Sequence, residues 1–408
     1  MATNHSHHGR DLLVCCTVGL ICFFGAYLRI PVLPLFAASL GASTAQVGLI
    51  NAAFMLSAGL LAIPAGLLAD RAGQRPMLLG GLLVMSGSSL LIPFSSGPAM
   101  MAAAYLVFGA GLAAFTPTMM SCVADVSPPS QLGRAYSWYT TAVYLGMTIG
   151  PAAGGLLGRI AGLGRVFFFS AGLTFLAFLF SRGFLPKTAA TGHTNGRLTS
   201  VSASLLLLLP NRRLVACLIG TLGGCFGFGM FVSFLPLHAN TQGLNAGHVG
   251  VIFAAQAMSN ALLRIPFGRL SDRVDRGIMS AAGLALFAVA LAAIGTCRGA
   301  VSLSLCAAFL GFGMGVGFTA LGALVAVVVP KEERGLAMGL YNSCIYLGMM
   351  VSSASMGWAI RHVGFRNGFI VAGAVSLLLT AGFFALYRHA RAAENRGEKP
   401  RDASGISW

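Results

Sequence analysis

The chain repeats one short motif at a fixed distance, and this repeat limits the folds that are open to it. The segment Gly66–Pro76 carries an acid, bases and glycines between two long apolar runs, and Gly268–Arg273 repeats its first part. The aspartates of the two copies, Asp70 and Asp272, lie 202 positions apart (272 − 70). One offset that recurs over roughly 110 residues indicates two homologous halves. The same offset relates Pro34 to Pro236, Pro128 to Pro330, Tyr139 to Tyr341 and Tyr144 to Tyr346.

The composition places both halves in a membrane. Of 408 residues, 56% are hydrophobic and 9% are charged, whereas soluble proteins contain about 25% charged residues. The apolar runs are continuous and long enough for helices, which need roughly 20 residues to cross the hydrocarbon core. We predict twelve helices, near residues 12–34, 47–68, 76–95, 99–122, 136–158, 164–185, 214–237, 248–268, 278–296, 300–328, 335–360 and 365–387.

The predicted fold is therefore an all-α integral membrane protein of two pseudo-symmetric six-helix bundles. The first bundle is expected over residues 1–185 and the second over residues 214–387. Between them, residues 186–213 are polar and basic, which predicts a cytoplasmic linker. Residues 388–408 are rich in charge, which predicts a disordered cytoplasmic tail.

The net charge of +16 raises the question of nucleic acid, and the positions of the bases argue against it. On a twelve-helix path most arginines and lysines fall on one side, together with both termini and the Gly66–Pro76 loop. Positively charged loops remain in the cytoplasm. We therefore predict a multi-pass protein of the cell membrane with both termini cytoplasmic. The lipid bilayer is its expected partner, and the chain is expected to be a monomer.

Nothing in the sequence indicates an enzyme. It has no nucleotide-binding loop, no metal-ligand constellation and no paired catalytic carboxylates, so we expect no cofactor and no metal. None of the nine cysteines forms a Cys-x-x-Cys pair, and we interpret them as small buried apolar residues. His5, His7 and His8 precede the first predicted helix and are interpreted as a solvated tail.

The repeated motif supports a more specific identification. Its first copy reads Gly-x-Leu-Ala-Asp-Arg-x-Gly-x-Arg and resembles the signature loop of the major facilitator superfamily. The resemblance extends over nearly the whole chain and implies a transporter of the bacterial inner-membrane type. It implies a clamp in which Asp70, Arg71 and Arg134 hold the two halves together on the cytoplasmic side of the outward-facing state. The alternative is that these charges only set topology. The motif residues are Gly66, Asp70, Arg71, Gly73 and Arg75, with Gly268, Asp272 and Arg273 in a second copy that has Asp275 in place of a glycine.

A second resemblance lies in the fifth predicted helix, which contains Gly-x3-Gly-Pro-x2-Gly-Gly. This pattern is similar to the signature of antiporter or exporter branches of the superfamily and implies a hinge with a tight seal between the halves. Generic packing of small residues is the alternative. The fourth helix has Tyr105 where drug:proton antiporters usually carry an arginine. The signature residues are Gly146, Gly150, Pro151, Gly154 and Gly155.

The coupling ion is less clear from the sequence. Proton relays in membranes use buried carboxylates or histidines, and none of the ten acidic residues is predicted at mid-membrane. Asp125, near the cytoplasmic end of the fourth helix, comes closest. Arg29 and Arg264 lie inside predicted helices, where each either faces a cavity or extends to the membrane surface. If both face the cavity, its positive field favours an anionic substrate.

The resemblance implies that helices 1, 4, 7 and 10 line a central cavity, with contributions from helices 2, 5, 8 and 11. A mostly apolar cavity with a few hydrogen-bonding groups suits an amphipathic organic molecule. The interpretation we favour is proton-coupled efflux of such small molecules by alternating access. The alternatives are a carrier of organic anions or metabolites and, more remotely, a membrane sensor or scaffold. Polar candidates for the cavity are Tyr139, Tyr144, Gln256, Asn260, Tyr341 and Asn342, besides Tyr27 and Tyr346.

Replacing Asp70 with Asn is expected to cripple the transport cycle while leaving membrane insertion largely intact. The amide keeps the shape of the side chain but removes the charge on which the implied clamp depends. Transport rate in membrane vesicles, normalised to the amount of inserted protein, tests this. An unchanged rate would refute the clamp.

Overall fold

The computed structural model describes residues 2–128, 131–185, 211–270, 274–329 and 334–395. The predicted linker, apart from its last residues, and residues 396–408 lie outside this range. The helices of the first half are α1 (Ala2–Leu28), α2 (Leu33–Ser39), α3 (Thr44–Ala72), α4 (Gln74–Leu91), η1 (Ile92–Phe94), α5 (Pro98–Asp125), α6 (Leu132–Ala161) and α7 (Leu163–Phe184). Those of the second half are α9 (Arg212–Thr241), α10 (Ala246–Leu270), α11 (Arg276–Ile294), α12 (Ala300–Val327) and α13 (Arg334–Asn395).

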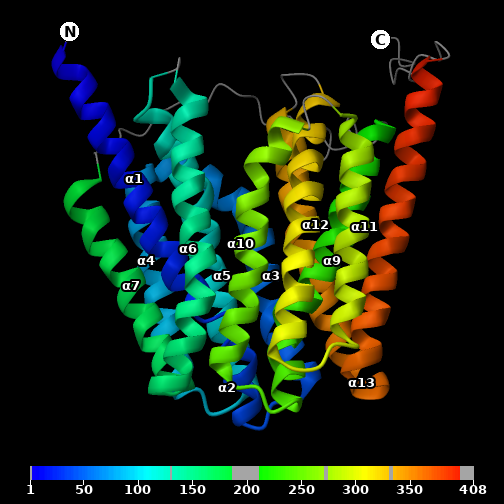
Figure 1. The fold of residues 1–408 in the computed structure, drawn as a ribbon. Coiled ribbons are helices and arrows are strands. Elements are labelled where there is room, and N and C mark those ends of the chain that lie inside the picture. Colours follow the sequence, from blue (N-terminus) through cyan, green and yellow to red (C-terminus); the bar gives the residue numbers. More distant parts are fainter. Residues whose placement is uncertain (1, 129–130, 186–210, 271–273, 330–333, 396–408) are drawn as a thin grey trace, which may run out of the picture.

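The helices form two bundles that stand side by side (Figure 1). Helices α1–α7 make the first bundle and α9–α13 the second, and both ends of the chain lie at the same end of the molecule. We call this end the terminal face and the opposite end the far face. The predicted fold is confirmed: in the part of the chain that the structure describes, twelve membrane-crossing helices are arranged as two six-helix bundles.

Two predicted helices differ in detail from the structure. The first is broken, because the backbone turns between Leu28 and Leu33 before α2 begins. The last two are joined in α13, which leaves helical geometry only at Gly364 (φ 75°). The predicted tails are shorter than expected, since α1 starts at Ala2 and α13 continues to Asn395. Helical hydrogen bonding therefore extends past the apolar runs into the charged ends of the chain.

The described helices have the length and apolarity that a membrane requires. Ten segments satisfy this criterion, and one of them, Ala337–Ala392, contains both helices that meet at Gly364. Helix α6 is not among the ten, because its glycines, proline and polar side chains lower its mean hydropathy. It nevertheless runs parallel to its neighbours across the bundle (Figure 1).

The tight turns at the far face repeat between the halves. Gly41 and Gly243, which precede α3 and α10, have φ values of 81° and 77°. Gly162 and Gly364, at the turns after the fifth and eleventh crossings, have φ values of 96° and 75°. These left-handed conformations favour glycine, because other residues carry a Cβ that clashes there. Both pairs obey the 202-residue offset, so the two halves share turn geometry as well as sequence.

The packing inside each bundle repeats in the same way. A Cβ on Gly146 of α6 would lie 2.7 Å from the carbonyl oxygen of Leu20, and one on Gly348 of α13 would lie 2.8 Å from that of Leu222. Gly109 of α5 approaches the α3 backbone equally closely at Phe54. Small residues allow helices in lipid to come near enough for extensive van der Waals contact. Each bundle is thus held by glycine contacts at equivalent positions.

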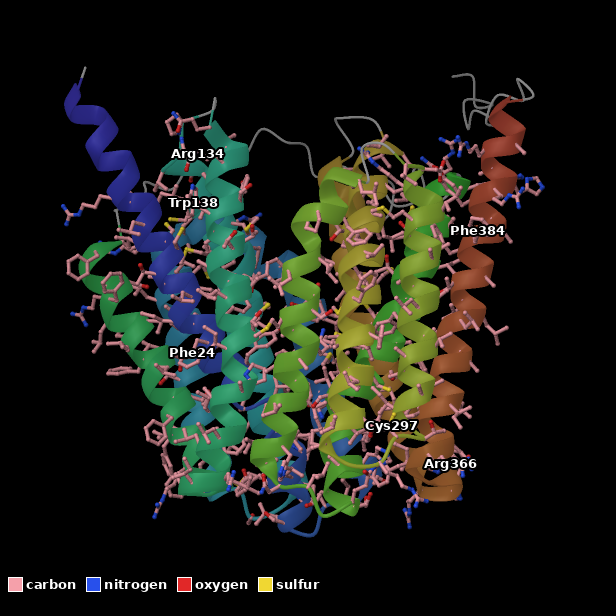
Figure 2. The ribbon with its side chains drawn as sticks, in the orientation of Figure 1. Phe24, Arg134, Trp138, Cys297, Arg366 and Phe384 are labelled. Carbon is pink, nitrogen blue, oxygen red and sulfur yellow. The ribbon has the colours of Figure 1, made fainter. Side chains whose placement is uncertain are left out.

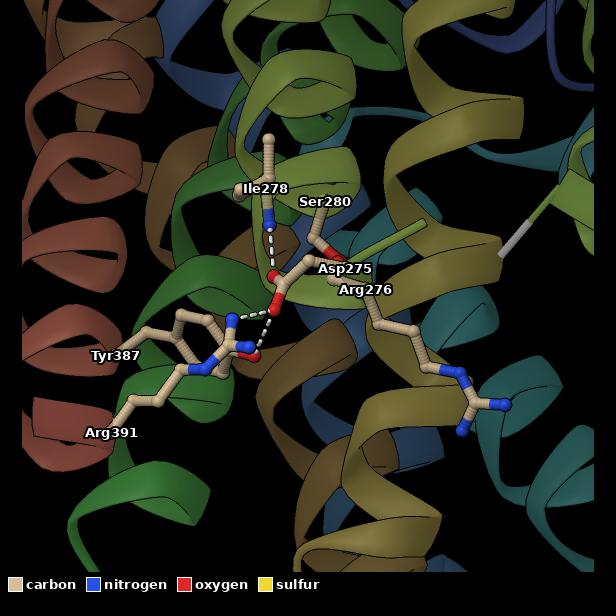
Figure 3. A network of polar contacts seen from close by, with 6 residues as sticks. All are labelled: Asp275, Arg276, Ile278, Ser280, Tyr387 and Arg391. Atoms are coloured by element: carbon tan, nitrogen blue, oxygen red, sulfur yellow. Dashed lines mark hydrogen bonds and ion pairs between the residues drawn. The ribbon is translucent and has the colours of Figure 1, made fainter. Parts of the chain in front are cut away.

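Asp275 shows where the repeat departs from symmetry, because it occupies the position of Gly73 in the first half. Its Oδ1 accepts the backbone N–H of Ile278 at 2.9 Å and so caps the start of α11. Its Oδ2 accepts the Tyr387 hydroxyl at 3.2 Å and forms an ion pair with Arg391 (Figure 3). Asp275 therefore ties the start of α11 to the end of α13 within the second bundle.

Replacing Asp275 with Ala is expected to destabilise the protein by about 1 kcal/mol through the lost helix cap. The ion pair adds little, because Arg391 is half exposed and water screens the interaction. The apparent melting temperature in detergent measures the loss. Asp275→Asn is the matched control, since asparagine caps helices as well as aspartate does. Equal destabilisation by both variants would contradict the cap as the main contribution.

Candidate transport site

The two bundles meet chiefly along two helix pairs, α3 with α13 and α6 with α10, and α9 adds smaller contacts with α2 and α3. In the first pair, a Cβ on Gly48 would collide with the carbonyl oxygen of Ser353. The hydroxyl of Thr44 donates to the carbonyl oxygen of Gly357 at 3.0 Å. These residues lie in the far-face halves of α3 and α13. The bundles are therefore in backbone contact on this side.

The second pair repeats the arrangement. A Cβ on Gly250 of α10 would lie 2.9 Å from the carbonyl oxygen of Pro151, and Gly155 of α6 packs on the backbone of Ala246 and Gly250. The 202-residue offset relates Gly48 to Gly250, Pro151 to Ser353 and Gly155 to Gly357. We call the contacts formed by Gly48, Gly155, Gly250 and Gly357 the far-face seal. It has the pseudo-symmetry of the molecule.

The glycine signature of α6 serves two different neighbours. Gly146, Gly150 and Gly154 all face α1, where a Cβ on Gly150 would lie 2.9 Å from Cβ of Tyr27. Gly155, one position further, faces α10 in the other bundle. Successive residues of a helix point about 100° apart, so Gly154 and Gly155 can contact different helices. One signature thus joins α6 to its own bundle and to the opposite one.

Toward the terminal face the two bundles diverge (Figure 1). A Cβ on Gly66 of α3 or Gly339 of α13 would meet no atom within 4 Å, although the same two helices touch in their far-face halves. Gly66 therefore has no closely packed helix beside it in this state. The structure is closed at the far face and separated at the terminal face.

The predicted clamp lies where the bundles are separated. The side chains of Asp70 and Arg264, and Asp272 and Arg273 of the second motif copy, lie outside the described residues, while Gly268 of that copy lies in α10. Arg71 and Arg134 are exposed, and Figure 2 shows Arg134 at the terminal end of α6. Gly73 has a φ of 92° and links α3 directly to α4. Arg75 donates to the carbonyl oxygen of Arg182 at 2.6 Å, a contact within the first bundle.

Gln74, between the second glycine and the last arginine of the motif, is a residue that the sequence analysis did not single out. Its side chain is buried, and its Nε2 donates to Asp125 Oδ2 at 2.6 Å and to Ser121 Oγ at 2.9 Å. Asp125 itself is exposed at the end of α5. Gln74 therefore connects the motif to the one acid that the sequence analysis placed nearest the membrane interior. Its position inside the motif was the available signal.

Arg29 is buried inside the first bundle, at the break between α1 and α2. Only 2% of its surface is exposed, so the alternative that it extends to the membrane surface is wrong. Its guanidinium lies 3.1 Å from the ring centroid of Phe108 and 4.8 Å from that of Tyr105, and it donates to Ser89 Oγ at 3.2 Å. Among the described residues no carboxylate forms an ion pair with it. Cation–π contacts and one hydrogen bond stabilise this charge.

The tyrosines separate into two groups. Tyr139 and Tyr341 are buried in the hydrophobic cores of their bundles, and the Tyr139 ring packs against Gly19. Tyr144 and Tyr346 are only partly buried. Across the bundle interface, a Cβ added to Gly59 would lie 3.0 Å from the Cβ of Tyr346. Tyr27 of α1 packs against Gly150 of α6 and lies near Tyr144 and Tyr346. We call Tyr27, Tyr144 and Tyr346 the central tyrosines, since they come from both bundles.

The remaining polar candidates lie in the second bundle. Gln256 is buried, and its Nε2 contacts Met314 Sδ at 3.5 Å while its backbone supports Gly311. Asn260 is partly buried on the same helix, one turn nearer the terminal face. Asn342 is exposed and donates to the carbonyl oxygen of Met338 at 3.0 Å. The structure thus brings the central tyrosines together, while Gln256 forms part of the packing between α10 and α12.

Comparison with known proteins agrees with this architecture. The family model of the Major Facilitator Superfamily matches residues 15–254 and again residues 217–408. An uncharacterized MFS-type transporter of Methanocaldococcus jannaschii is 26% identical over 85% of this chain and 92% of its own length. The quinolone resistance protein NorA of Staphylococcus aureus is 25% identical over 60% of this chain and 63% of its own length. A bacterial homolog of the human lysosomal transporter Spinster, inward-facing and unoccupied, has the same fold (TM-score 0.75, 15% identity, 96% and 98% of the two chains).

Replacing Gly155 with Leu is expected to impair transport strongly. The added side chain would meet the α10 backbone and cost about 1–3 kcal/mol in the state with a closed far face, which is roughly a 5- to 150-fold shift in the population of that state. Transport rate per inserted molecule measures the effect.

Gly172→Leu is the matched control, because a Cβ at Gly172 of α7 meets no atom within 4 Å. It should transport at the wild-type rate. Equal activity of the Gly155 and Gly172 variants would show that the far-face contact is dispensable.

Proposed function

Because the chain belongs to the Major Facilitator Superfamily, we propose that it exports small amphipathic organic compounds in exchange for protons. The observation that carries this proposal is the geometry of α6. On one face its glycines pack against α1, and on another face Gly155 packs against α10 of the opposite bundle. A helix that packs tightly on both bundles can move with one and seal against the other. This is the requirement of alternating access, in which two bundles rock about a central site.

In the proposed cycle, the described state is inward-facing. The terminal face carries most of the basic loops, which favours the cytoplasm for this side. Substrate enters between the separated terminal halves while the far-face seal is closed. Opening the seal requires Gly48, Gly155, Gly250 and Gly357 to leave their backbone contacts together. The clamp motif around Asp70 is then positioned to close the terminal face, where Gly66 offers room for a neighbouring helix.

The central tyrosines are the proposed substrate contacts. Each combines an aromatic ring with a hydroxyl, so the group suits molecules that have both apolar surface and hydrogen-bonding atoms. Tyr144 and Tyr346 occupy equivalent positions in the two halves, so both bundles offer the proposed substrate the same group. The similarity to a quinolone resistance protein supports an organic compound of this kind. Asp125, through Gln74, is the proposed proton-responsive group, and a monomer is the proposed functional unit.

A carrier of organic anions is the second candidate. Arg29 supports it, because among the described residues this buried cation has no carboxylate partner. A positive charge beside Tyr105 and Phe108 raises the electrostatic potential in the first bundle and attracts anions. The two candidates therefore differ in the charge of the substrate they expect.

Proton flux in proteoliposomes distinguishes the candidates. A pH-sensitive dye is trapped inside, a pH gradient is imposed, and cationic, neutral and anionic amphipathic compounds are added one by one. If the protein exports drug-like compounds in exchange for protons, cationic or neutral compounds should cause proton movement. Asp125→Asn should reduce that movement. Proton movement with anions alone would replace the first candidate by the second.

The variant Arg29→Gln separates the two further. It should abolish a response to anions but leave a response to cations within about twofold, since it removes a charge that only an anion would use. Arg366→Gln is the control, because Arg366 is an exposed arginine near the far face (Figure 2). A response to no compound of the panel, in protein that is folded and correctly inserted, would contradict both candidates for the classes tested.

A further inference from the structure

Two cysteines of the second bundle lie unusually close together at the far face. The sulfur atoms of Cys297 and Cys306 are 3.0 Å apart. Cys297 follows the end of α11, and Cys306 lies in the second turn of α12. A disulfide requires a sulfur–sulfur distance of about 2.05 Å, so a shift of about 1 Å would join them. The interpretation of all nine cysteines as inert packing does not fit this pair.

The position of Cys297 is fixed by its surroundings. Its carbonyl oxygen accepts a hydrogen bond from Gln242 Nε2 at 3.2 Å, and the N–H of Gly299 donates to Gln242 Oε1 at 2.8 Å. The short loop between α11 and α12 is thus fastened to the end of α9. Because Gln242 holds the loop at Cys297 and again at Gly299, the thiol is kept near Cys306 and does not need a large backbone movement to reach it.

The pair is also accessible to a soluble oxidant. Both thiols are partly exposed, and the neighbouring residues Thr296 and Arg298 are exposed. Figure 2 shows Cys297 near the far face, away from the chain ends. In the topology proposed above this face lies outside the cytoplasm, where disulfides form and persist. The cellular part of the inference rests on that proposed topology.

We propose that Cys297 and Cys306 form a disulfide that covalently fastens the far-face end of the α11–α12 hairpin. The oxidant is a small disulfide of the glutathione type. One cysteine thiolate attacks it, a protein–glutathione mixed disulfide forms and one glutathione thiolate leaves. The thiolate of the other cysteine attacks the protein sulfur of that mixed disulfide and releases the second glutathione. The two cysteines lose two protons and two electrons, and oxidised glutathione becomes two reduced molecules.

A soft metal ion fits the site less well. Thiolates bind copper(I) or zinc, but zinc sites use three or four protein ligands. Among the described residues no group of three or more His, Cys, Asp or Glu side chains lies close enough to hold a metal ion. Disulfide formation needs only the two sulfurs that are present.

Cys15 and Cys122 provide an internal comparison. Their sulfurs are 3.9 Å apart between α1 and α5, but both residues are completely buried within the first bundle. An aqueous oxidant cannot reach them without local unfolding. We therefore expect selective oxidation of the far-face pair.

Mass spectrometry of the full-length protein tests the chemistry. Purified protein is treated with oxidised glutathione, free thiols are alkylated, and the chain is digested with trypsin, which cleaves after Arg298 and separates the two cysteines. The expected result is a disulfide-linked peptide pair that contains Cys297 and Cys306, with an intact mass about 2 Da lower because two hydrogens are lost. Cys306→Ser should prevent this change and Cys122→Ser should not. Complete alkylation of both Cys297 and Cys306 in the wild type would overturn the proposal.

Labelling of intact cells tests the compartment. In the Cys306→Ser variant, Cys297 is left without its partner and should react with a membrane-impermeant maleimide added outside the cells. Labelling only after permeabilisation would place the far face in the cytoplasm and overturn oxidation in the cell. Neither experiment measures transport, so failure of the disulfide and failure of the proposed export are distinguishable.

Discussion

Backbone contact between helices at glycine is the interaction on which this structure depends. In lipid, burying apolar side chains gains little, because the surrounding acyl chains are equally apolar. Helices are instead held by close van der Waals contact, which small residues permit. Gly146 against Leu20, Gly109 against Phe54 and their equivalents hold each bundle together. The far-face seal uses the same interaction between bundles, so its contacts resemble those of a bundle interior.

Contacts within a bundle and contacts between bundles thus use the same interaction, although only the contacts between bundles open in the proposed cycle. Gly154 and Gly155 are neighbours, yet the first packs within a bundle and the second packs between bundles. The contacts inside a bundle are supported along several helices. The seal consists of two helix pairs that touch in their far-face halves and separate toward the terminal face. Contacts limited to one end of the interface are consistent with rigid-body rocking of the two halves.

The charges follow a second constraint, the cost of placing them in the membrane. Asp125 and Arg75 lie at the terminal face, where Gln74 donates to Asp125 and the backbone carbonyl of Arg182 accepts from Arg75. Asp275 caps the start of α11 with its side chain. Gly73, at the equivalent position of the first half, has a positive φ and no side chain that could form such a cap. Arg29 is the exception, since it is buried among aromatic rings. A charge whose burial costs free energy is suited to recognising the charge of a substrate.

The sequence alone determined the helices and the two halves, because these depend on local apolarity and on the repeat. It also determined the positions of the turns, where a left-handed backbone conformation requires a glycine such as Gly364. It also identified the glycines of the α6 signature as candidates for a seal between the halves. Only the tertiary structure decided which helix each glycine faces, that Tyr139 is core while Tyr144 lies near the bundle interface, and that Arg29 is buried. It alone brought Cys297 to Cys306. These outcomes depend on the rotation of each helix about its axis, and one residue changes that direction by about 100°. Composition and spacing do not specify which neighbour lies in that direction; packing of the whole chain does.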